Sequence, residues 1–462
     1  MSHTSHVKPK LRNPKLVYTV ATIAALAGLL FGIDIGVISG ALGFIKQDFH
    51  LSNFEQEMVV SSILAGAVIG TIISGRISHY WGRRMAILIS AIIFTLGSIF
   101  SAFAPSIHSL IAIRFLLGTA IGIASFTAPL YLSEISPKRI RGALVSMYQL
   151  MITIGIFLAF TSDALLHSTG SWRLMLGVTA IPAFIMFIGV LFLPRSPRWL
   201  MLAGRKDLAL KILHRIHGDS EEVATEIKEI EDNLAHSVSG VKVFKLSYFR
   251  HVLFLGITLQ FFQIMTGMNV LMYYAPKIYA MAGFVGATAV WANVINGLVN
   301  VLTTILAILA IDRWGRRPLL FFGLTLQIIG MATLALIFGH GATTDLLRYT
   351  TMAGMLVFIV GFAASLGPVI WVICAEIFPL KSRDTGVTFT TATNWICNAF
   401  IGGTFLTAIA WIGTSNTFWT LAAIAVAAML FIYFFTPETK NISLERLEKH
   451  LMSGERLRDL GR

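Results

Sequence analysis

The sequence from Ala24 to Ala41, AALAGLLFGIDIGVISGA, is a long apolar run with several glycines and one carboxylate, Asp34, near its middle. Its length and composition predict a membrane-spanning helix. A charge at the centre of such a helix costs about 2.5 to 3.5 kcal/mol, so the carboxylate needs a physical reason. Either Asp34 lies near a helix end and is hydrated, or it binds a proton or a substrate inside the membrane. Apolar residues flank it on both sides, which favours the second interpretation.

The predicted partner of Asp34 is Arg114, in the run SLIAIRFLLGTAIGIASF, because it is the only basic residue deep inside a predicted span. A nearby guanidinium favours the ionised form of a carboxylate, whereas burial favours the protonated form. A carboxylate that alternates between two such environments takes up and releases a proton. Asp34 and Arg114 are therefore the candidate proton-coupling pair.

The composition excludes an ordinary soluble domain. The 462 residues are 56% hydrophobic and 13% charged, with a mean hydropathy of +0.76, whereas soluble domains are about 25% charged. The formal charge of +13 is dispersed between apolar runs, so it does not indicate nucleic-acid binding. Cys374 and Cys397 lie in apolar segments and predict neither a disulfide framework nor a zinc site. The basic stretch before the first run does not resemble a cleavable signal, so that span is expected to be retained.

Hydropathy predicts twelve apolar runs, at 17–41, 58–78, 85–104, 109–131, 143–165, 173–193, 252–275, 288–311, 318–339, 350–374, 386–411 and 416–436. The amino terminus, the even-numbered loops and the carboxyl-terminal tail hold 31 of the 36 lysines and arginines when Arg76, at the end of the second run, is counted with the loop that follows it. Basic residues stay on the cytoplasmic side during insertion, so both termini are expected in the cytoplasm. Twelve spans is an even number, as this topology requires.

The expected fold is an all-α polytopic membrane protein with two pseudo-symmetric six-helix bundles. The expected divisions are an amino-terminal bundle at 1–193, a cytoplasmic linker at 194–251, a carboxyl-terminal bundle at 252–436 and a cytoplasmic tail at 437–462. Within the linker, Lys206 to His217 and Glu221 to Ala235 predict short amphipathic helices at the membrane surface. A solvated linker explains them better than a regulatory partner site.

Three motifs occur twice in the same order. HYWGRR at 79–84 returns as DRWGRR at 312–317, EISP at 134–137 returns as EIFP at 376–379, and PRSP at 194–197 is answered by PETK at 437–440. Their offsets are nearly equal, which indicates an internal duplication. Duplicated six-helix halves with a binding site between them are typical of alternating-access carriers.

Glu134 and Glu376 end the fourth and tenth spans, close in sequence to arginines of these motifs. Arginine binds carboxylates in bidentate fashion, and such pairs can join two bundles in one state and separate in the other. The arginines alone are explained equally well by topology, but topology needs no carboxylates, so the glutamates favour a gate. The predicted cytoplasmic gate comprises Arg83, Arg84, Glu134, Arg141, Arg316, Arg317, Glu376 and Arg383.

Amide side chains occur inside several spans, and a buried amide without partners costs about 1 to 3 kcal/mol. The seventh span carries Gln260, Gln263 and Asn269, and Gln263 and Asn269 diverge on a regular helix unless Gly267 and Pro276 loosen it. Further intramembrane amides are Gln149, Asn296, Asn300, Asn394 and Asn398. Each alone is better explained by helix-to-helix hydrogen bonding. Together they predict a polar cavity at mid-depth, where amides match hydroxyl groups that both donate and accept.

Trp371 follows Gly367 and Pro368 in the tenth span. The glycine and the proline are expected to interrupt this helix. An indole at such a break could cover the apolar face of a sugar ring, and Trp395 is expected to line the same space.

Several of these motifs together carry a resemblance to a known family: FGIDIGVISGA, PLYLSEISPKRIRG, SMYQLMITIGI, PRSPRWL, TGMNVLMYYAPKI, DRWGRRP, GPVIWVICAEIFP, TATNWICNAFIGGTFL and PETK. Over essentially its whole length the chain resembles the sugar porters of the major facilitator superfamily, above all bacterial galactose–proton and arabinose–proton symporters. The resemblance implies a monomeric carrier in the bacterial inner membrane. It also implies a monosaccharide substrate, with the proton as coupling ion and no other cofactor.

By position, the resemblance makes Asp34 the proton-coupling carboxylate and Arg114 its partner. It implies sugar contacts at Gln149, Gln263, Asn269, Asn300, Trp371 and Asn394. Three residues depart from the family pattern: Ile264 replaces a second glutamine, His79 replaces an acid or amide, and Arg195 replaces an acid. The first puts the identity of the sugar in doubt, the second weakens the first-half gate, and the third removes a carboxylate with which neighbouring residues would have paired.

Three alternative functions remain at this stage. A proton-independent facilitator of the same fold is disfavoured by Asp34. A transporter-like nutrient sensor would need a signalling domain, which the short tail does not provide. A membrane enzyme is the least supported, because no nucleophile and base occur together and no metal motif such as HExxH is present.

Overall fold

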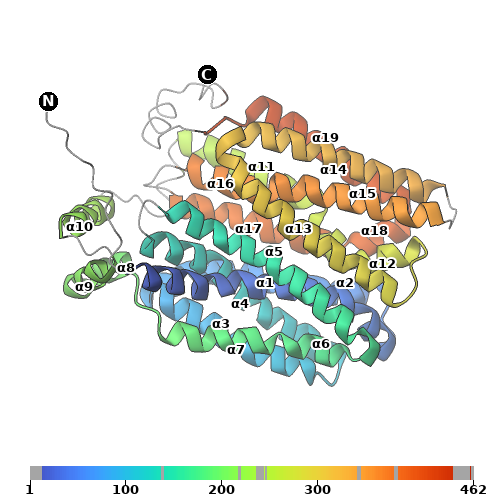
Figure 1. Cartoon of the computed structure of the whole chain (residues 1–462), viewed down its shortest axis with the longest axis horizontal. Helices are drawn as coiled ribbons and strands as arrows, with labels where there is room; N and C mark the ends of the chain where they lie inside the picture. Colours follow the sequence, from blue (N-terminus) through green and yellow to red (C-terminus); the bar gives the residue numbers. More distant parts are fainter. Residues whose placement is uncertain are drawn as a thin grey trace.

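The computed structural model describes residues 13–136, 140–216, 220–235, 244, 247–340, 345–378, 383–440 and 458, and the described parts contain helices without strands. The amino-terminal bundle consists of α1 Pro14–Phe49, α2 Asn53–Tyr80, α3 Arg83–Ala102, α4 Ile107–Ile135, α5 Arg141–Leu166, α6 Trp172–Val178 and α7 Ala180–Leu191. The carboxyl-terminal bundle consists of α11 Ser247–Met265, α12 Met268–Met281, α13 Ala287–Trp314, α14 Arg316–Gly339, α15 Asp345–Ala364, α16 Leu366–Ile377, α17 Arg383–Gly402, α18 Phe405–Ile412 and α19 Thr414–Phe435. Figure 1 shows the two bundles side by side with nearly parallel helices.

Three short helices, α8 Pro197–Leu202, α9 Lys206–Ile216 and α10 Ser220–Ala235, connect the bundles and lie beyond one end of them (Figure 1). We call this end the linker end and the opposite one the distal end. The structure confirms the two predicted linker helices, and α8 is an addition that the sequence did not indicate. Of the tail at 437–462, only 437–440 and Arg458 are described.

Eleven segments are long and apolar enough to cross a membrane, and the pair Thr385–Gly402 and Phe405–Ile412, bent by 44°, makes a twelfth. The chain is therefore a multi-pass membrane protein with the predicted number of spans. Four predicted runs, at 173–193, 252–275, 350–374 and 386–411, each contain two helices instead of one.

The breaks have local causes. Between α11 and α12, Gly267 has a φ of +97°, a conformation that favours glycine, so the helix is broken between Gln263 and Asn269, whereas Pro276 lies inside α12. In the tenth span the break falls at Ser365, with φ −133° and ψ −93°. The prediction that Gly367 and Pro368 interrupt the helix is confirmed, because Pro368 cannot bond to the carbonyl of Ala364, the last residue of α15, and both residues lie in the first turn of α16. A proline is tolerated there, since first-turn N–H groups have no partner within the helix.

Close helix packing builds each bundle. A Cβ atom on Gly32 of α1 would lie 2.0 Å from the carbonyl oxygen of Ile152 on α5, and one on Gly118 of α4 would lie 1.9 Å from that of Ile63 on α2. Only glycine allows these backbones to approach so closely, as is common between membrane helices. The glycines of the Ala24–Ala41 run thus hold α1 against α5 and fix the position of Asp34.

The two bundles meet along α5 and α13 on one side and along α2 and α17 on the other. Further contacts between the bundles join α1 to α12 and α2 to α18.

Candidate functional site

Asp34 and Arg114 face each other inside the amino-terminal bundle. Asp34 on α1 is 8% exposed and Arg114 on α4 is 1% exposed, and Nη2 of Arg114 lies 3.6 Å from Oδ2 of Asp34. The arginine also donates from Nε to the carbonyl oxygen of Val59 on α2, at 2.8 Å. The structure therefore confirms that the two residues pair and that neither lies in bulk water. The pair links three helices of one bundle through a single buried guanidinium.

Three amides form a hydrogen-bonded cluster inside the carboxyl-terminal bundle. Asn394 on α17 donates from Nδ2 to Oε1 of Gln260 at 2.7 Å and to Oε1 of Gln263 at 3.0 Å. Gln263 in turn donates from Nε2 to the carbonyl oxygens of Leu366 and Gly367, at 2.7 and 3.2 Å. The break at Ser365 places these two carbonyls in the first turn of α16. The cluster therefore joins α11 and α17 to the break in the tenth span.

The other predicted sugar contacts lie on four different helices. Gln149 and Asn269 are half-buried on α5 and α12, Asn300 is buried on α13, and Trp371 on α16 is 36% exposed. Within the described ranges, none of these four side chains donates a hydrogen bond to the three-amide cluster. Trp395 is buried and packs edge-on against Phe31 of α1, with ring centroids 5.0 Å apart, so this ring joins the two bundles.

Glu134 is the centre of a buried clamp at the linker end of the amino-terminal bundle. Arg83, at the start of α3, donates to Oε1 of Glu134 from Nε at 3.1 Å and from Nη2 at 2.7 Å. The hydroxyl of Ser196, just before α8, donates to the other carboxylate oxygen at 2.5 Å. Arg83 also donates from Nη1 to the carbonyl oxygen of Ser78, which ties the end of α2 to the same group.

The carboxyl-terminal bundle repeats this clamp. Arg316 donates from Nη2 to Oε1 of Glu376 at 2.7 Å and from Nε to Oε2 at 3.3 Å. Thr439 donates its hydroxyl to Oε2 at 2.5 Å, in the role that Ser196 has in the other half. The duplicated sequence motifs thus form duplicated geometry.

The two ion pairs of these clamps each lie within a single bundle. The gate between the bundles stays a prediction. Arg84 and Arg317 donate instead to backbone carbonyls, of Val190 and Leu191 near the end of α7 and of Tyr433 near the end of α19. The side chains of Arg141 and Arg383 lie outside the described residues.

Because Arg195 stands where the family pattern has an acid, the first turns of α3 and α14 are capped differently in the two halves. Glu438 accepts hydrogen bonds from the N–H groups of Arg316 and Arg317, both at 3.0 Å, and so caps the first turn of α14. At the corresponding position of the first half stands Arg195, whose guanidinium lies 5.6 Å from the ring of Trp199, and Gly82 gives α3 no side-chain cap. Of the other two departures, His79 is exposed and Ile264 is buried in the apolar core.

Sequence reasoning missed two buried carboxylates. Glu57 on α2 is 1% exposed and Asp163 on α5 is 1% exposed. Asp163 accepts a hydrogen bond at Oδ2 from the N–H of Gly40 on α1, at 3.0 Å. The signal was present, since Asp163 lies inside a predicted span and Glu57 one residue before another.

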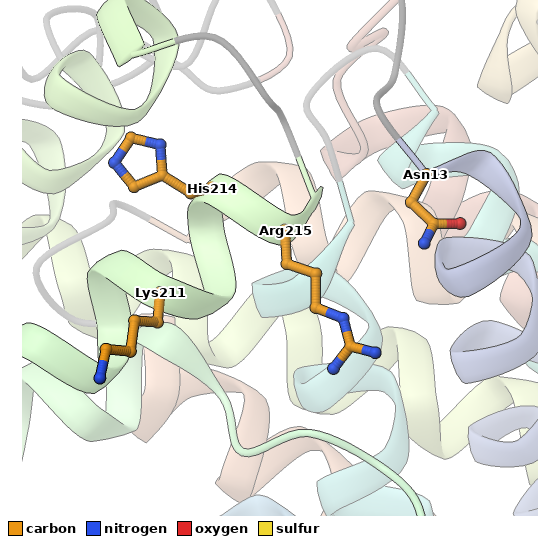
Figure 2. A pocket seen from close by; sticks show the side chains of 4 residues that line it. All are labelled: Asn13, Lys211, His214 and Arg215. Atoms are coloured by element: carbon orange, nitrogen blue, oxygen red, sulfur yellow. The ribbon is translucent and has the colours of Figure 1, made fainter.

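No metal site is indicated within the described ranges, where His, Cys, Asp and Glu do not gather in groups of three. A cavity of about 590 Å³ lies at the linker end and is lined by Asn13, Lys211, His214 and Arg215 (Figure 2). It shares no residue with the acid–arginine pair or the amide cluster. We therefore treat it as separate from the candidate site.

Fold and site together define a membrane carrier of the major facilitator fold. Comparison with known proteins places the chain more narrowly, because residues 20–451 match the family model for sugar (and other) transporters. The chain belongs to this sugar transporter family, whose members are transporters and not enzymes.

The relatives support this assignment. The chain is 50% identical to the galactose-proton symporter of Escherichia coli, over 97% of each chain. It is 45% identical to the arabinose-proton symporter of the same organism, over 96% of this chain and 95% of that one. Among solved structures, the proton:xylose symporter XylE bound to 6-bromo-6-deoxy-D-glucose matches with a TM-score of 0.82 and 30% identity, covering 95% of this chain and 99% of that one.

Proposed function

We propose that this protein is a proton-coupled sugar symporter that works by alternating access and carries a hexose or pentose such as galactose, glucose, arabinose or xylose. The observation that carries the proposal is the buried contact between Asp34 and Arg114 in a chain 50% identical to a proton symporter. A uniporter has no need of a buried acid–arginine pair at the centre of its bundle. The coupling ion is the proton, and no other cofactor is invoked.

In the proposed cycle, Asp34 is protonated from the outside and releases Arg114. The sugar then binds and the two bundles rock about it. Inside, the proton leaves and Arg114 pairs with Asp34 again, which is the arrangement that the 3.6 Å contact represents. Sugar and proton drive this exchange only through their different affinities for the two states.

The sugar site proposed here consists of Gln149, Gln263, Asn269, Asn300, Trp371 and Asn394. Asn394 already donates hydrogen bonds to Gln260 and to Gln263, so the amides of Asn394 and Gln263 are oriented before the sugar arrives. Such preorganisation lowers the entropy lost on binding. The partly exposed indole of Trp371 would cover the apolar face of the sugar ring.

The arginine–glutamate clamps support a modified role for the proposed gate. Because each clamp holds helix ends together within one bundle, we propose that the clamps make each bundle move as a rigid body. Arg83, Glu134, Arg316 and Glu376 would form the clamps, with Arg84 and Arg317 holding neighbouring helix ends. Arg141 and Arg383 stay proposed members of the gate on sequence grounds alone.

The proposal includes the placement of the chain. The bundles span 1–193 and 252–436, the linker at 194–251 and the tail at 437–462 are cytoplasmic, and the protein is a monomer in the lipid bilayer of the bacterial inner membrane. The linker end then faces the cytoplasm and the distal end the periplasm. The distribution of lysine and arginine supports this orientation.

Uptake into liposomes tests the function directly. Purified protein is reconstituted and offered a panel of labelled sugars, with and without a proton gradient that is acidic outside. We expect uphill accumulation of at least one hexose or pentose only when the gradient is present. Equal uptake in both conditions would identify a facilitator, and no flux of any sugar would refute the proposed substrate class.

A further inference from the structure

Among the residues that the structure describes, three polar contacts join the two bundles. Lys277, near the distal end of α12, donates to Oδ1 of Asn53 at 3.2 Å. Asn293 on α13 donates to the hydroxyl of Ser39 on α1 at 3.1 Å. The third contact joins Glu57 to Thr407 of α18. All six residues lie in the distal parts of their helices, away from the arginine clamps.

The contact of Glu57 has an unusual geometry. Oε1 accepts a hydrogen bond from the backbone N–H of Thr407 at 2.6 Å, and Oε2 accepts one from the Thr407 hydroxyl at 2.7 Å. Only 1% of the surface of Glu57 is exposed, so its carboxylate is shielded from water. Both oxygens of a buried carboxylate are therefore satisfied by one residue of the opposite bundle. Hydrogen bonds to a charged group of this kind are about twice as strong as those between neutral groups.

Thr407 lies in the first turn of α18, where backbone N–H groups lack partners within the helix. The cap position is Thr404, but it makes no side-chain cap because its hydroxyl donates to the carbonyl oxygen of Phe400. Glu57 therefore supplies the cap that α18 does not make for itself. A carboxylate is favourable at this position because it also faces the positive end of the helix dipole.

The bend between α17 and α18 explains why such a cap is needed. The two segments meet at 44° around Gly403 and Thr404, which ends the hydrogen-bond ladder of one helix and starts another. A buried first turn without acceptors is unfavourable. While the bundles are closed at the distal end, Glu57 accepts the hydrogen bond from the N–H group of Thr407. When the bundles part, water can hydrate both this N–H group and the Glu57 carboxylate.

We propose that Glu57 and Thr407 form a latch that holds the distal end closed and sets how readily it opens. The proposal rests on the proposed alternating-access function, and it makes Glu57 a positioning residue that does not touch sugar. Because the contact is lost on opening and replaced by water on both sides, it shifts the equilibrium between the two states without preventing their exchange.

Distances between spin labels test the latch in the absence of sugar and of a proton gradient. One label is placed at Phe103, between α3 and α4, and the other at Leu346, in the first turn of α15. Both positions are distal and highly exposed, at 78% and 73%, and they belong to different bundles. The background lacks both native cysteines, Cys374 and Cys397.

Glu57→Gln keeps the length of the side chain but removes the charge. We expect it to raise the ratio of distal-open to distal-closed protein about tenfold, which corresponds to about 1.4 kcal/mol. Thr407→Val removes only the hydroxyl donor, keeps the backbone contact and should shift the ratio in the same direction by less. The double variant should shift it no further than Glu57→Gln alone, to within about twofold, because the two side chains act on one contact.

Two matched controls belong to the same helices. Glu55→Gln makes the same chemical change two residues earlier, where the carboxylate accepts hydrogen bonds, among the described residues, from Ser52 at its own helix end. Thr404→Val removes the hydroxyl that donates to Phe400. Both controls should leave the distance distribution as in the parent protein.

An unchanged distribution in both Glu57→Gln and Thr407→Val, a shift toward the closed form, or fully additive effects in the double variant would each overturn the latch. If Glu57→Gln fails to fold, Thr407→Val alone decides. The spin-label measurement needs neither sugar nor a proton gradient. A failure of the latch would therefore appear in the spin-label distances, whereas a failure of the proposed transport function would appear in the uptake assay.

Discussion

Replacing Asp34 with asparagine keeps the shape of the buried pair and removes one of its charges. Arg114 lies 3.6 Å from Asp34 and is 1% exposed. At an effective dielectric constant of about 20, two unit charges at this separation attract each other by about 5 kcal/mol. Removing one partner of a buried pair typically costs about 3 to 5 kcal/mol, because the other charge stays buried without compensation. We therefore expect Asp34→Asn to lower the stability of the folded protein measurably in thermal unfolding.

The larger effect of Asp34→Asn concerns the coupling of sugar transport to the proton gradient. One proton moving through 100 mV releases about 2.3 kcal/mol, enough for roughly a 50-fold sugar accumulation if one proton accompanies each sugar. In Asp34→Asn, the side chain no longer exchanges a proton, so sugar exchange across the liposome membrane should continue while accumulation falls to the external concentration. The exchange of labelled for unlabelled sugar measures whether sugar still crosses the membrane. Net uptake in a proton gradient measures whether sugar still accumulates.

The same helix provides a control. Asp48 on α1 pairs with Arg173 at 2.9 Å, but these side chains are 47% and 44% exposed. An exposed pair of this kind contributes about 0 to 1 kcal/mol, so Asp48→Asn should unfold nearly as the parent does and should accumulate sugar fully. Uphill accumulation by Asp34→Asn would refute the coupling role of the acid. Loss of exchange together with accumulation in a folded variant would show that Asp34 serves binding instead.

Glu134→Gln removes the charge and one of the two carboxylate oxygens that accept from Arg83 and Ser196. We expect it to slow turnover without abolishing sugar binding. Initial uptake rates and a binding titration separate the two effects, and unchanged turnover counts against the clamp. Arg195→Glu offers the first turn of α3 the carboxylate that Glu438 gives α14, so it should raise stability by about 0.3 to 1 kcal/mol in thermal unfolding, and a decrease would contradict the equivalence of the halves. Gly32→Ala places a methyl group 2.0 Å from the Ile152 carbonyl oxygen and should cost about 1 to 3 kcal/mol. Gly43→Ala on the same helix meets nothing within 4 Å and should gain up to about 1 kcal/mol; equal effects of the two changes would refute the close approach of α1 and α5.

The central pair was predictable because the bilayer makes intramembrane charges conspicuous. Asp34 and Arg114 stand out in apolar runs, and two opposite buried charges have few partners other than each other. The duplication was predictable as well, and the clamps at Glu134 and Glu376 repeat it in three dimensions. Gly267 was recognised because its residue type matches a break between helices.

What the sequence did not predict depends on which helices meet. Hydropathy indicates that a residue lies in a span but not which neighbour it faces, so the sequence did not predict that Arg83 pairs with Glu134 and Arg316 with Glu376 within one bundle. The break at Ser365 lies three residues before Pro368, whose ring cannot follow a continuous helix there, so the sequence indicates the break but not the residue at which it falls. Glu57 was overlooked because it precedes its predicted run by one residue and had the position of a hydrated helix end. Its role as a hydrogen-bond acceptor depends on Thr407, which lies 350 residues away in the chain.

The location of the polar contacts relative to the bundles bears on how the protein can move. At the linker end, Glu134 and Glu376 each join three chain segments, which belong to one bundle and to the linker or the tail that follows it. The contacts that join the bundles, including that of Glu57, are fewer and occupy the distal parts of the helices. A rocking motion can therefore break the distal contacts while each bundle keeps its own hydrogen bonds. The free-energy difference between the two states is then governed by a small set of exchangeable contacts, which is the condition under which a proton at Asp34 and a sugar at the amides can reverse the balance.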